Sequence, residues 1–442
     1  SFSAENLGTI ALDTSENHLR IMGDILDGSA VPAEDHQNFR DFRRKMRKYA
    51  KLMQIAYETR PPKLVEHDWR DKLTMGKLGL GMKGLGKDDM SDLMRLILIN
   101  IYDVMNETFT SEQLRAALAL DAVVGTPMGP RSPNTVFTYL HRFFGETQGF
   151  NGVSQVAGGL GQLGHVLAQS VTALGVEVRC DQRVASIDKT HDKATGVTLA
   201  SGEILSANLI ISSADPVTTF KNLLGYSNIE TGFARRIEHF RTKSGTAKVH
   251  LALSALPKFK GLDEQDLKQR LIIAPTMNDI ERAFNALKYD EISEHPVLDI
   301  SIPTLNDPSL AASGQHVLSA IVQYAPHSPK AGWDHLREEF LNRVVSEIER
   351  YAPGISDLVC GKELLTPSDL EAEFGMTGGN WHHGELTMDQ VLMTRPAHGA
   401  TQYRTPIDGL YLCGAGSHPG GGLMGLAGKN AAQEIIRRGD AA

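Results

Sequence analysis

The sequence has little cysteine, and its cysteines are far apart. Cys180, Cys360 and Cys413 are the only three among 442 residues, and none belongs to a CxxC pair. A disulfide framework, a zinc site and a dithiol redox centre therefore have poor support. A reducing compartment fits this composition best.

Signals for membrane insertion and export are also absent. No apolar run reaches the roughly 18 residues of a spanning helix, and the longest candidate, residues 93–101, contains Arg95 and Asn100. Residues 1–5 show neither the basic nor the apolar region of a signal peptide, and they contain no initiator Met. We therefore expect a cytoplasmic or mitochondrial-matrix protein whose chain is processed, truncated or incompletely recorded.

The chain lacks an excess of positive charge. Its 45 Lys and Arg residues against 53 Asp and Glu give a net charge of -8. This balance argues against wholesale nucleic-acid binding, which usually requires a basic domain. The hydrophobic fraction of 41% is ample for a sizeable core in two or three domains.

One local basic stretch contrasts with this negative total. Over residues 34–57, apolar residues recur at three- and four-residue steps, which predicts a helix. The apolar positions are Phe39, Phe42, Met46, Tyr49 and Met53, and the other face carries Arg40, Arg43, Arg44, Lys45, Arg47, Lys48 and Lys51. That basic face is either the solvated side of a core-packed helix or a peripheral contact with an anionic membrane.

The remaining patterns predict alternating helices and strands. Strands are expected at 9–13, 19–22, 176–179, 184–187, 196–199, 203–205, 209–212, 246–253, 297–302 and 316–324. Helices are expected at 88–105, 111–120, 134–144, 159–174 and 333–351. Asp88 and Ser111 are the predicted N-caps of the first two of these helices.

The C-terminus is the most informative stretch. An apolar strand at 410–413 runs into a glycine-rich loop and then into a helix that reaches Arg438. Eight of the twenty residues over 409–428 are glycine. Such a loop lets the backbone approach a ligand closely, and the helix would direct its N–H groups and positive dipole end at that ligand. A tight connection without a ligand would need only one or two glycines.

Two other glycine runs match GxGxxG formally. Residues 159–164 precede a predicted helix, but no clear strand leads into them. Residues 79–84 lie between helical segments, again without a preceding strand. As dinucleotide fingerprints the first is weak, and we treat the second as a false positive.

Residues 378–385 form a polar cluster that includes His382, His383 and a nearby carboxylate. Adjacent histidines point in different directions, and neither HxxxH nor HxH spacing occurs, so we expect no metal site. A polar loop facing a pocket fits the pattern better, with a surface turn as the alternative.

Several of these stretches together resemble the phytoene desaturase-like flavoproteins. They are residues 121–125, 158–163, 210–216, 378–380 with His383, 388–390, and 409–430, of which the last is the most specific. The resemblance covers essentially the whole chain and is nearest to the branch of pyridine nucleotide-disulphide oxidoreductase domain-containing proteins. Disulphide chemistry is not carried over, because the chain has no paired cysteines.

The resemblance implies an α/β (α+β) fold of the amine oxidase and phytoene desaturase type. Its Rossmann-like FAD-binding domain would be discontinuous, over 155–222 and 405–442, and a mixed sheet-and-helix substrate domain would take 1–154 and 223–404. The implied FAD contacts are Val184 at the adenine end, Gly414, Ala415 and Gly416 at the ribityl and pyrophosphate, and Gly422, Leu423, Met424 and Gly425 at the isoalloxazine ring. The following helix would favour the anionic reduced flavin.

The sequence departs from the family pattern at its start. Family members begin with a strand, a GxGxxG turn, a helix and an acidic ribose ligand, a unit of at least ~30 residues. Residue 1 falls after that unit. We therefore expect either an unrecorded upstream part or a fragment that holds FAD weakly.

The implied reaction is FAD-dependent dehydrogenation of a small hydrophobic, isoprenoid-like molecule by hydride transfer to the flavin. This chemistry needs no protein base, so no catalytic residue is assigned, and Asn380, His383 and His418 are the candidate polar groups of the pocket. A redox-neutral flavin isomerase on the same scaffold stays open. So does a cofactor-less binding or scaffold protein, if the absent N-terminal unit is native. The sequence fixes neither the electron acceptor nor the oligomeric state, and a homodimer is compatible with it.

Overall fold

The chain forms two compact units, each assembled from separate segments. The structure is a computed structural model that describes residues 7–63, 65, 68–148, 154–422 and 425–440. One unit comprises residues 1–48, 96–178 and 245–368, and the other comprises residues 49–95, 179–244 and 369–442. The mixture of helices and sheets confirms the predicted α/β (α+β) class. The predicted division into FAD-binding and substrate domains stays a prediction.

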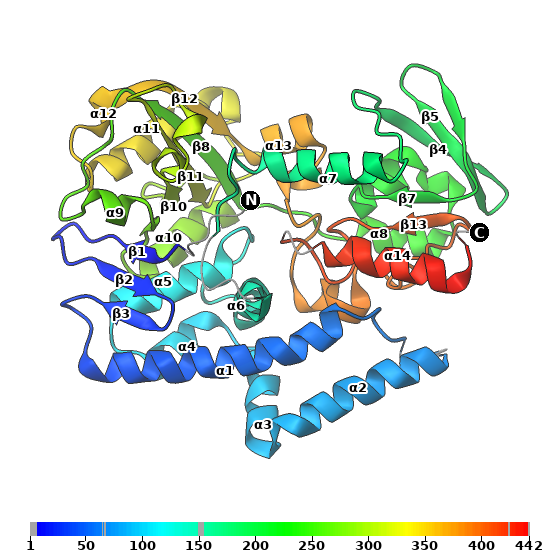
Figure 1. Cartoon of the computed structure of the whole chain (residues 1–442), viewed down its shortest axis with the longest axis horizontal. Coiled ribbons are helices and arrows are strands. Elements are labelled where there is room, and N and C mark those ends of the chain that lie inside the picture. The colour runs from blue at the N-terminus through cyan, green and yellow to red at the C-terminus, as the bar shows by residue number, and fades with distance from the viewer. Residues whose placement is uncertain (1–6, 64, 66–67, 149–153, 423–424, 441–442) are drawn as a thin grey trace. The chain divides into compact units, whose positions relative to one another are not determined.

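An eight-stranded sheet is the centre of the first unit (Figure 1). Its strand order is β12-β8-β11-β10-β9-β1-β2-β3. The strands are β1 (Thr9–Ala11), β2 (Leu19–Met22), β3 (Ile25–Asp27), β8 (Thr246–Leu253), β9 (Arg270–Ile273), β10 (Val297–Ser301), β11 (His316–Gln323) and β12 (Val359–Leu365). Only β1 and β9 pair in parallel, so the early hairpin extends a sheet built from the second half of the chain.

Helices cover this sheet and complete its core. Alternate residues of β8, namely Val249, Leu251 and Leu253, are buried in one cluster with Phe340 and Val344 of α11 (Trp333–Glu349), as the two-residue period of a strand requires. The other helices of this unit are the first part of α1 (Ala33–Tyr57), α4 (Ile101–Thr108), α5 (Glu112–Val123), α6 (Thr135–Phe143), η1 (Phe144–Gln148), α7 (Gly161–Ala173), α9 (Glu264–Leu267), α10 (Met277–Lys288), η4 (Pro303–Leu305), η5 (Pro308–Leu310) and α12 (Ile355–Leu358).

The second unit contains two smaller sheets. Strands β4 (Val184–Thr190), β5 (Lys193–Leu199) and β6 (Ile204–Ser206) form an antiparallel sheet. Strand β13 (Leu410–Leu412) pairs in parallel with β7 (Ile210–Ser212). The helices are α2 (Trp69–Leu85), most of α3 (Lys87–Leu96), η2 (Thr218–Leu223), η3 (Tyr226–Asn228), α8 (Thr231–Glu238), most of α13 (Pro367–Phe374), η6 (Thr377–Gly379), η7 (Met388–Gln390), η8 (Leu392–Thr394) and α14 (Leu426–Arg438).

Strand β13 is buried on both faces. Leu410 and Leu412 join one apolar cluster, whose aromatic members are Phe220 and Phe233. Tyr411 points the other way, into a cluster with Ala431 and Ile435 of α14. Helix α14 is therefore packed along the strand that leads into the glycine-rich loop, as Figure 1 shows in red.

Several predicted elements are confirmed. Strands β2 and β8 have the predicted bounds, and the C-terminal helix ends at Arg438 as expected. Helix α1 buries all five predicted apolar residues: Phe39, Phe42, Met46, Tyr49 and Met53. Ser111 caps α5, because its Oγ accepts from the Leu114 N–H at 3.3 Å.

Three local predictions are wrong. The helix expected over 88–105 is split into α3 and α4, because Asn100 caps α4 by accepting from the Asp103 N–H at 2.9 Å. Asp88 lies within the first turn of α3 and is not its N-cap. Residues 176–179 form no strand, and a β-strand needs a neighbouring strand to accept its hydrogen bonds.

The two GxGxxG matches lie in helical surroundings. Residues 79–84 are inside α2, which agrees with their treatment as a false positive. Residues 154–160, which lead into α7, form no strand.

The structure also bears on three features considered in the sequence: disulfides, metal clusters and membrane-spanning helices. All three cysteines are free. The described residues contain no group of three His, Cys, Asp or Glu side chains arranged for a metal ion. No helix within the described ranges combines the length and apolarity needed to cross a bilayer.

Candidate functional site

Two parallel strands of the second unit bring separate loops to one edge. Strands β7 and β13 end side by side, with Ser212 opposite Leu412. Residues 213–216 follow the first strand, and the glycine-rich loop follows the second. The carboxyl ends of neighbouring parallel strands are where α/β proteins usually bind ligands.

Three glycines of this loop are required by contacts within the chain. A Cβ on Gly414 would lie 2.1 Å from the Ser213 carbonyl oxygen, one on Gly416 would lie 2.3 Å from Pro216 Cδ, and one on Gly421 would lie 2.7 Å from His382 Cα. No side chain fits at these distances. The prediction attributed such glycines to a ligand, but here the close neighbour is the chain itself.

Gly425 and Gly428 are different, because a Cβ on either would meet no atom of the described residues within 4 Å. Gly425 is the N-cap of α14 in the left-handed conformation, with φ 62°, and no described side chain caps the helix. The first N–H groups of α14 therefore have no side-chain acceptor among the described residues. This arrangement can accommodate a negatively polarised group of a ligand.

Arg395 ties the glycine-rich loop to the histidine-containing segment. It is fully buried, and its guanidinium donates to the carbonyl of Ala415 at 3.0 Å and that of His382 at 2.6 Å. It also donates to the carbonyls of Glu385 at 2.9 Å and Gln390 at 3.0 Å. Burial lowers the pKa of Arg395 to about 9, which leaves it cationic at neutral pH.

Asp215 and Asn380 stabilise the turns next to the segments that Arg395 joins. Asp215 is 1% exposed and accepts from the hydroxyls of Thr218 and Thr377, both at 2.8 Å. Asn380 is equally buried; its amide donates to the Lys243 carbonyl, and its oxygen accepts from the His382 N–H, both at 2.8 Å. The side chain of Asn380 is therefore engaged on both sides in holding this turn.

The two predicted histidines occupy different surroundings. His383 has φ 54°, and its Nδ1 is buried without a hydrogen-bond partner among the described residues. Burial lowers the pKa of His383; Asp215 opposes this shift, and Arg395 adds to it. His418 is 1% exposed, and its Nε2 lies 2.9 Å from the Ala56 carbonyl oxygen, so its ring packs against the chain.

The structure brings only part of the predicted site together. Arg395 links Ala415 to the segment that holds Asn380 and His383, whereas Val184 begins β4 in the separate three-stranded sheet. Gly422 is exposed, and Leu423 and Met424 lie outside the described residues. The cofactor contacts assigned to these residues stay predictions.

Arg395 was missed in the sequence, although a signal exists. It is the only Lys or Arg between Lys362 and Arg404. A single cation in so long a stretch is more readily explained by a specific partner than by a solvated surface, which usually carries several charges.

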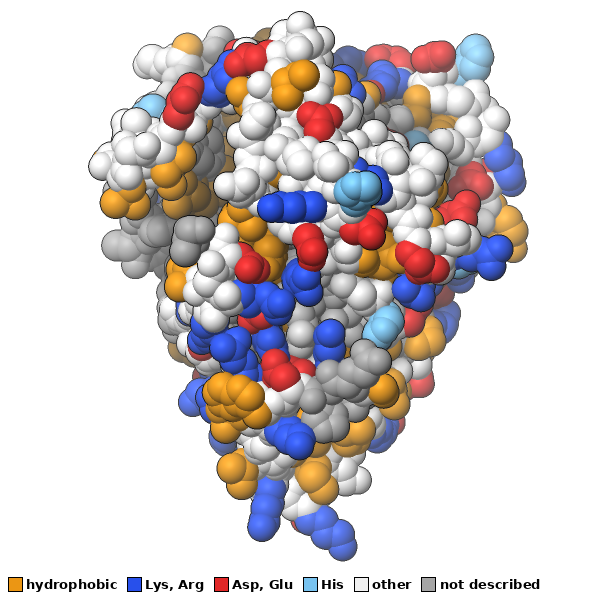
Figure 2. Space-filling view, turned by 90° about the vertical axis from the view of Figure 1, so that its right-hand side faces the viewer, with side chains coloured by type: hydrophobic (Ala, Val, Ile, Leu, Met, Phe, Trp, Pro, Cys, Tyr) orange, Lys and Arg blue, Asp and Glu red, His pale blue; other side chains and the backbone are white. Residues whose placement is uncertain are grey.

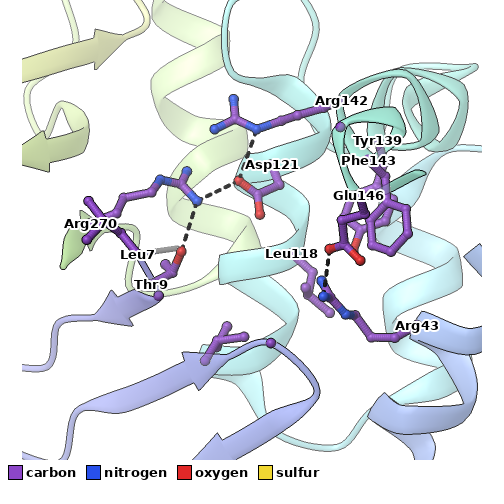
Figure 3. A pocket seen from close by; sticks show the side chains of 14 residues that line it. Leu7, Thr9, Arg43, Leu118, Asp121, Tyr139, Arg142, Phe143, Glu146 and Arg270 are labelled. Carbon is purple, nitrogen blue, oxygen red and sulfur yellow. Dashed lines mark hydrogen bonds and ion pairs between the residues drawn. The ribbon is translucent and has the colours of Figure 1, made fainter. Parts of the chain in front are cut away.

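A charged cavity of about 200 Å³ lies in the first unit (Figure 3). Two pairs form among its charged side chains, with Arg270 2.8 Å from Asp121 and Arg43 2.6 Å from Glu146. Arg270 also lies 2.9 Å from Asp299, which is outside the cavity lining. Burial lowers the pKa of Arg270, but Asp121 and Asp299 outweigh this effect, so its pKa lies above the ordinary value. We interpret these groups as an internal ion-pair network.

Comparison with known proteins places the chain in a family. Residues 31–436 match the family described as flavin containing amine oxidoreductase. The chain belongs to this family. The family confirms the predicted resemblance and supports the assignment of an FAD-dependent oxidoreductase fold.

Two curated relatives resemble this chain at different levels of sequence identity. The rat protein "Pyridine nucleotide-disulfide oxidoreductase domain-containing protein 2" (Rattus norvegicus) is 36% identical over 350 residues, which cover 76% of this chain and 60% of that protein. The lycopene-forming phytoene desaturase of Paracoccus sp. is 28% identical over 320 residues, covering 71% of this chain and 60% of that protein. The chain thus spans about 60% of the length of these curated relatives.

Solved structures confirm the fold at low identity. Putrescine oxidase bound to putrescine superposes with a TM-score of 0.57 at 14% identity, over 100% of this chain and 82% of that chain. Identity this low supports the amine oxidase fold alone.

Proposed function

We propose that this chain acts in an FAD-dependent oxidoreductase that dehydrogenates a small hydrophobic, isoprenoid-like molecule. Membership of the flavin amine oxidoreductase family and the likeness to a phytoene desaturase support the proposal. The observation that carries it is the start of α14, where no described side chain caps the helix and a Cβ on Gly425 or Gly428 would meet no described atom within 4 Å.

The residues present fit a flavin at this position. Gly425, Gly428 and the first N–H groups of α14 would hold its negatively polarised part, since no described side chain caps these N–H groups and no described atom lies close to the two glycines. Gly414, Ala415 and Gly416 would contribute backbone from the neighbouring loop. When bound, FAD supplies the acceptor for a hydride from a substrate C–H bond.

The side chains around the glycine-rich loop would hold its backbone in place and shield the flavin from water. They need not exchange protons with the substrate. Arg395 fixes the Ala415 carbonyl relative to the segment at His382. Asp215 fixes the turn at Thr377. A rigid loop that excludes water suits hydride transfer, which depends on orientation and desolvation.

The test uses the full-length protein, purified and mixed anaerobically with an unsaturated isoprenoid. We expect the oxidised flavin absorbance to bleach and a product with one more double bond to form. Conversion to a geometric isomer without net reduction would favour the isomerase alternative. A protein that stays colourless after incubation with FAD would contradict the proposal and favour a cofactor-less binding protein.

A further inference from the structure

The first turn of helix α2 is attached to the second unit by polar contacts. Asp68 forms a capping box with Asp71 at the helix start. Asp71 is 1% exposed and accepts from Arg60 at 3.0 Å and from Gln402 at 2.9 Å. These contacts all lie within the second unit, and they determine which face of α2 points outwards.

The outer face of α2 carries an apolar stripe. Trp69, Leu73 and Leu80 are 69%, 52% and 72% exposed. With 3.6 residues per turn, these three positions lie within about 40° of one another around the helix. The half-buried Leu78 and Met82 lie on the opposite side, so α2 has apolar residues on both faces.

Cations border this stripe on both sides. Lys72 and Lys83 lie on one side and Lys77 on the other, and all three are exposed. The only acid within the helix, Asp71, is buried and paired with Arg60. Figure 2 views the molecule from the right-hand side of Figure 1 and shows basic and hydrophobic side chains interspersed over its lower part, at the level of α2 and α3 in Figure 1. This local positive charge contrasts with the net charge of -8 for the chain.

Glycines make this helix costly to maintain in water. A Cβ on Gly76, Gly79 or Gly84 would meet no described atom within 4 Å, so contacts among the described residues do not require these glycines. Each lowers helix stability by roughly 1 kcal/mol relative to alanine. A helix that exposes Trp and Leu while carrying such residues gains stability if its outer face is covered.

We propose that the outer face of α2 docks on the surface of an anionic lipid bilayer. An exposed Trp, two Leu and bordering Lys side chains are the composition that inserts shallowly among lipid headgroups. The Lys ammonium groups meet the acidic headgroups while their aliphatic stems stay beside the apolar stripe. Helix α1 suits this role less, because Arg43 and Arg47 are paired with Asp24 and Glu146.

The binding test uses the full-length protein with two kinds of vesicle. One contains phosphatidylserine mixed with phosphatidylcholine, and the other contains phosphatidylcholine alone. We expect co-sedimentation with the anionic vesicles, weaker binding at high salt, and a blue shift of tryptophan fluorescence that is absent in Trp69→Phe. Absence of binding to anionic vesicles would overturn the proposal and favour a protein partner.

Matched variants locate the contact. Leu73→Asn with Leu80→Asn should lower partitioning onto anionic vesicles by at least about tenfold, because two apolar side chains are lost from the interface. Ile436→Asn on α14, where Ile436 is 69% exposed, is the control for an exposed apolar change and should bind normally. Arg40→Gln with Arg44→Gln on α1 should also bind normally. Circular dichroism melts confirm that each variant is folded.

A second set of variants tests whether the lysine charges, and not a change in folding, determine binding to anionic vesicles. Replacing Lys72, Lys77 and Lys83 by Gln should abolish the preference for anionic vesicles, whereas replacing them by Arg should preserve it. The proposal is wrong if folded α2 variants bind as wild type does, or if only the α1 variant loses binding.

Discussion

Two buried arginines show how differently the two units hold a cation. Arg270 in the first unit is held by the carboxylates of Asp121 and Asp299. Arg395 in the second unit has only main-chain carbonyls as its described hydrogen-bond acceptors. The pKa of Arg270 lies above its ordinary value, whereas that of Arg395 is lowered to about 9.

This difference in partners distinguishes Arg270, which stabilises a core, from Arg395, which lies beside the candidate flavin-binding loop. Arg142 also lies 3.6 Å from Asp121 and 3.8 Å from Asp299, so two arginines balance the two aspartates and their summed field outside the cavity is small. Arg395 keeps its charge next to the loop expected to hold the flavin, and carbonyl dipoles offset that charge only in part. The first arrangement stabilises a core, and the second fixes a loop while leaving positive potential near it.

The largest effect is expected from breaking the carboxylate-held pair. Arg270→Met leaves Asp121 and Asp299 without their main counter-ion, which should lower the free energy of unfolding by about 3 kcal/mol. Urea denaturation measures this change. Arg282→Met, at an exposed arginine of the same unit, is the control and should be nearly neutral. Equal stability of the two variants would mean that the network contributes nothing.

A smaller effect on stability is expected at the carbonyl-held cation. Arg395→Lys keeps the charge but offers three donors, which cannot replace a guanidinium that binds several carbonyls. Unsatisfied carbonyls should lower the free energy of unfolding by about 2 kcal/mol. The variant should also lose flavin on dialysis, because the Ala415 loop is no longer fixed. Arg404→Lys, at an exposed arginine nearby, should retain both properties.

Much of this arrangement could be predicted from local sequence patterns. Strand β13 and helix α14 follow from an apolar triplet, a glycine-rich loop and an alanine-rich helix. Strands β9 and β12 were missed because they are defined by partners far away in the chain. Arg395 was missed for the same reason, since its role depends on carbonyls that only the fold brings together.

The smallest expected effect is a pH dependence from His383. Its pKa is lowered in the folded chain, so below about pH 6.5 the unfolded chain binds a proton first. Stability contributed by the neutral ring is present above that pH and declines as the pH falls. His383→Gln should therefore flatten the loss of stability between pH 7 and 5, measured by urea denaturation. His398→Gln, at an exposed histidine, is the control, and an unchanged pH profile in the His383 variant would refute the assignment.

The flavin content of Gly428→Leu tests most directly whether the start of α14 holds the cofactor. Gly428 lies within α14 and borders open space, so the variant should fold normally while its side chain fills the expected flavin position. Gly79→Leu places the same side chain in open space on α2 and is the matched control. We expect a colourless Gly428→Leu protein beside a yellow Gly79→Leu protein. Full flavin occupancy in a folded Gly428→Leu protein would show that the cofactor lies elsewhere.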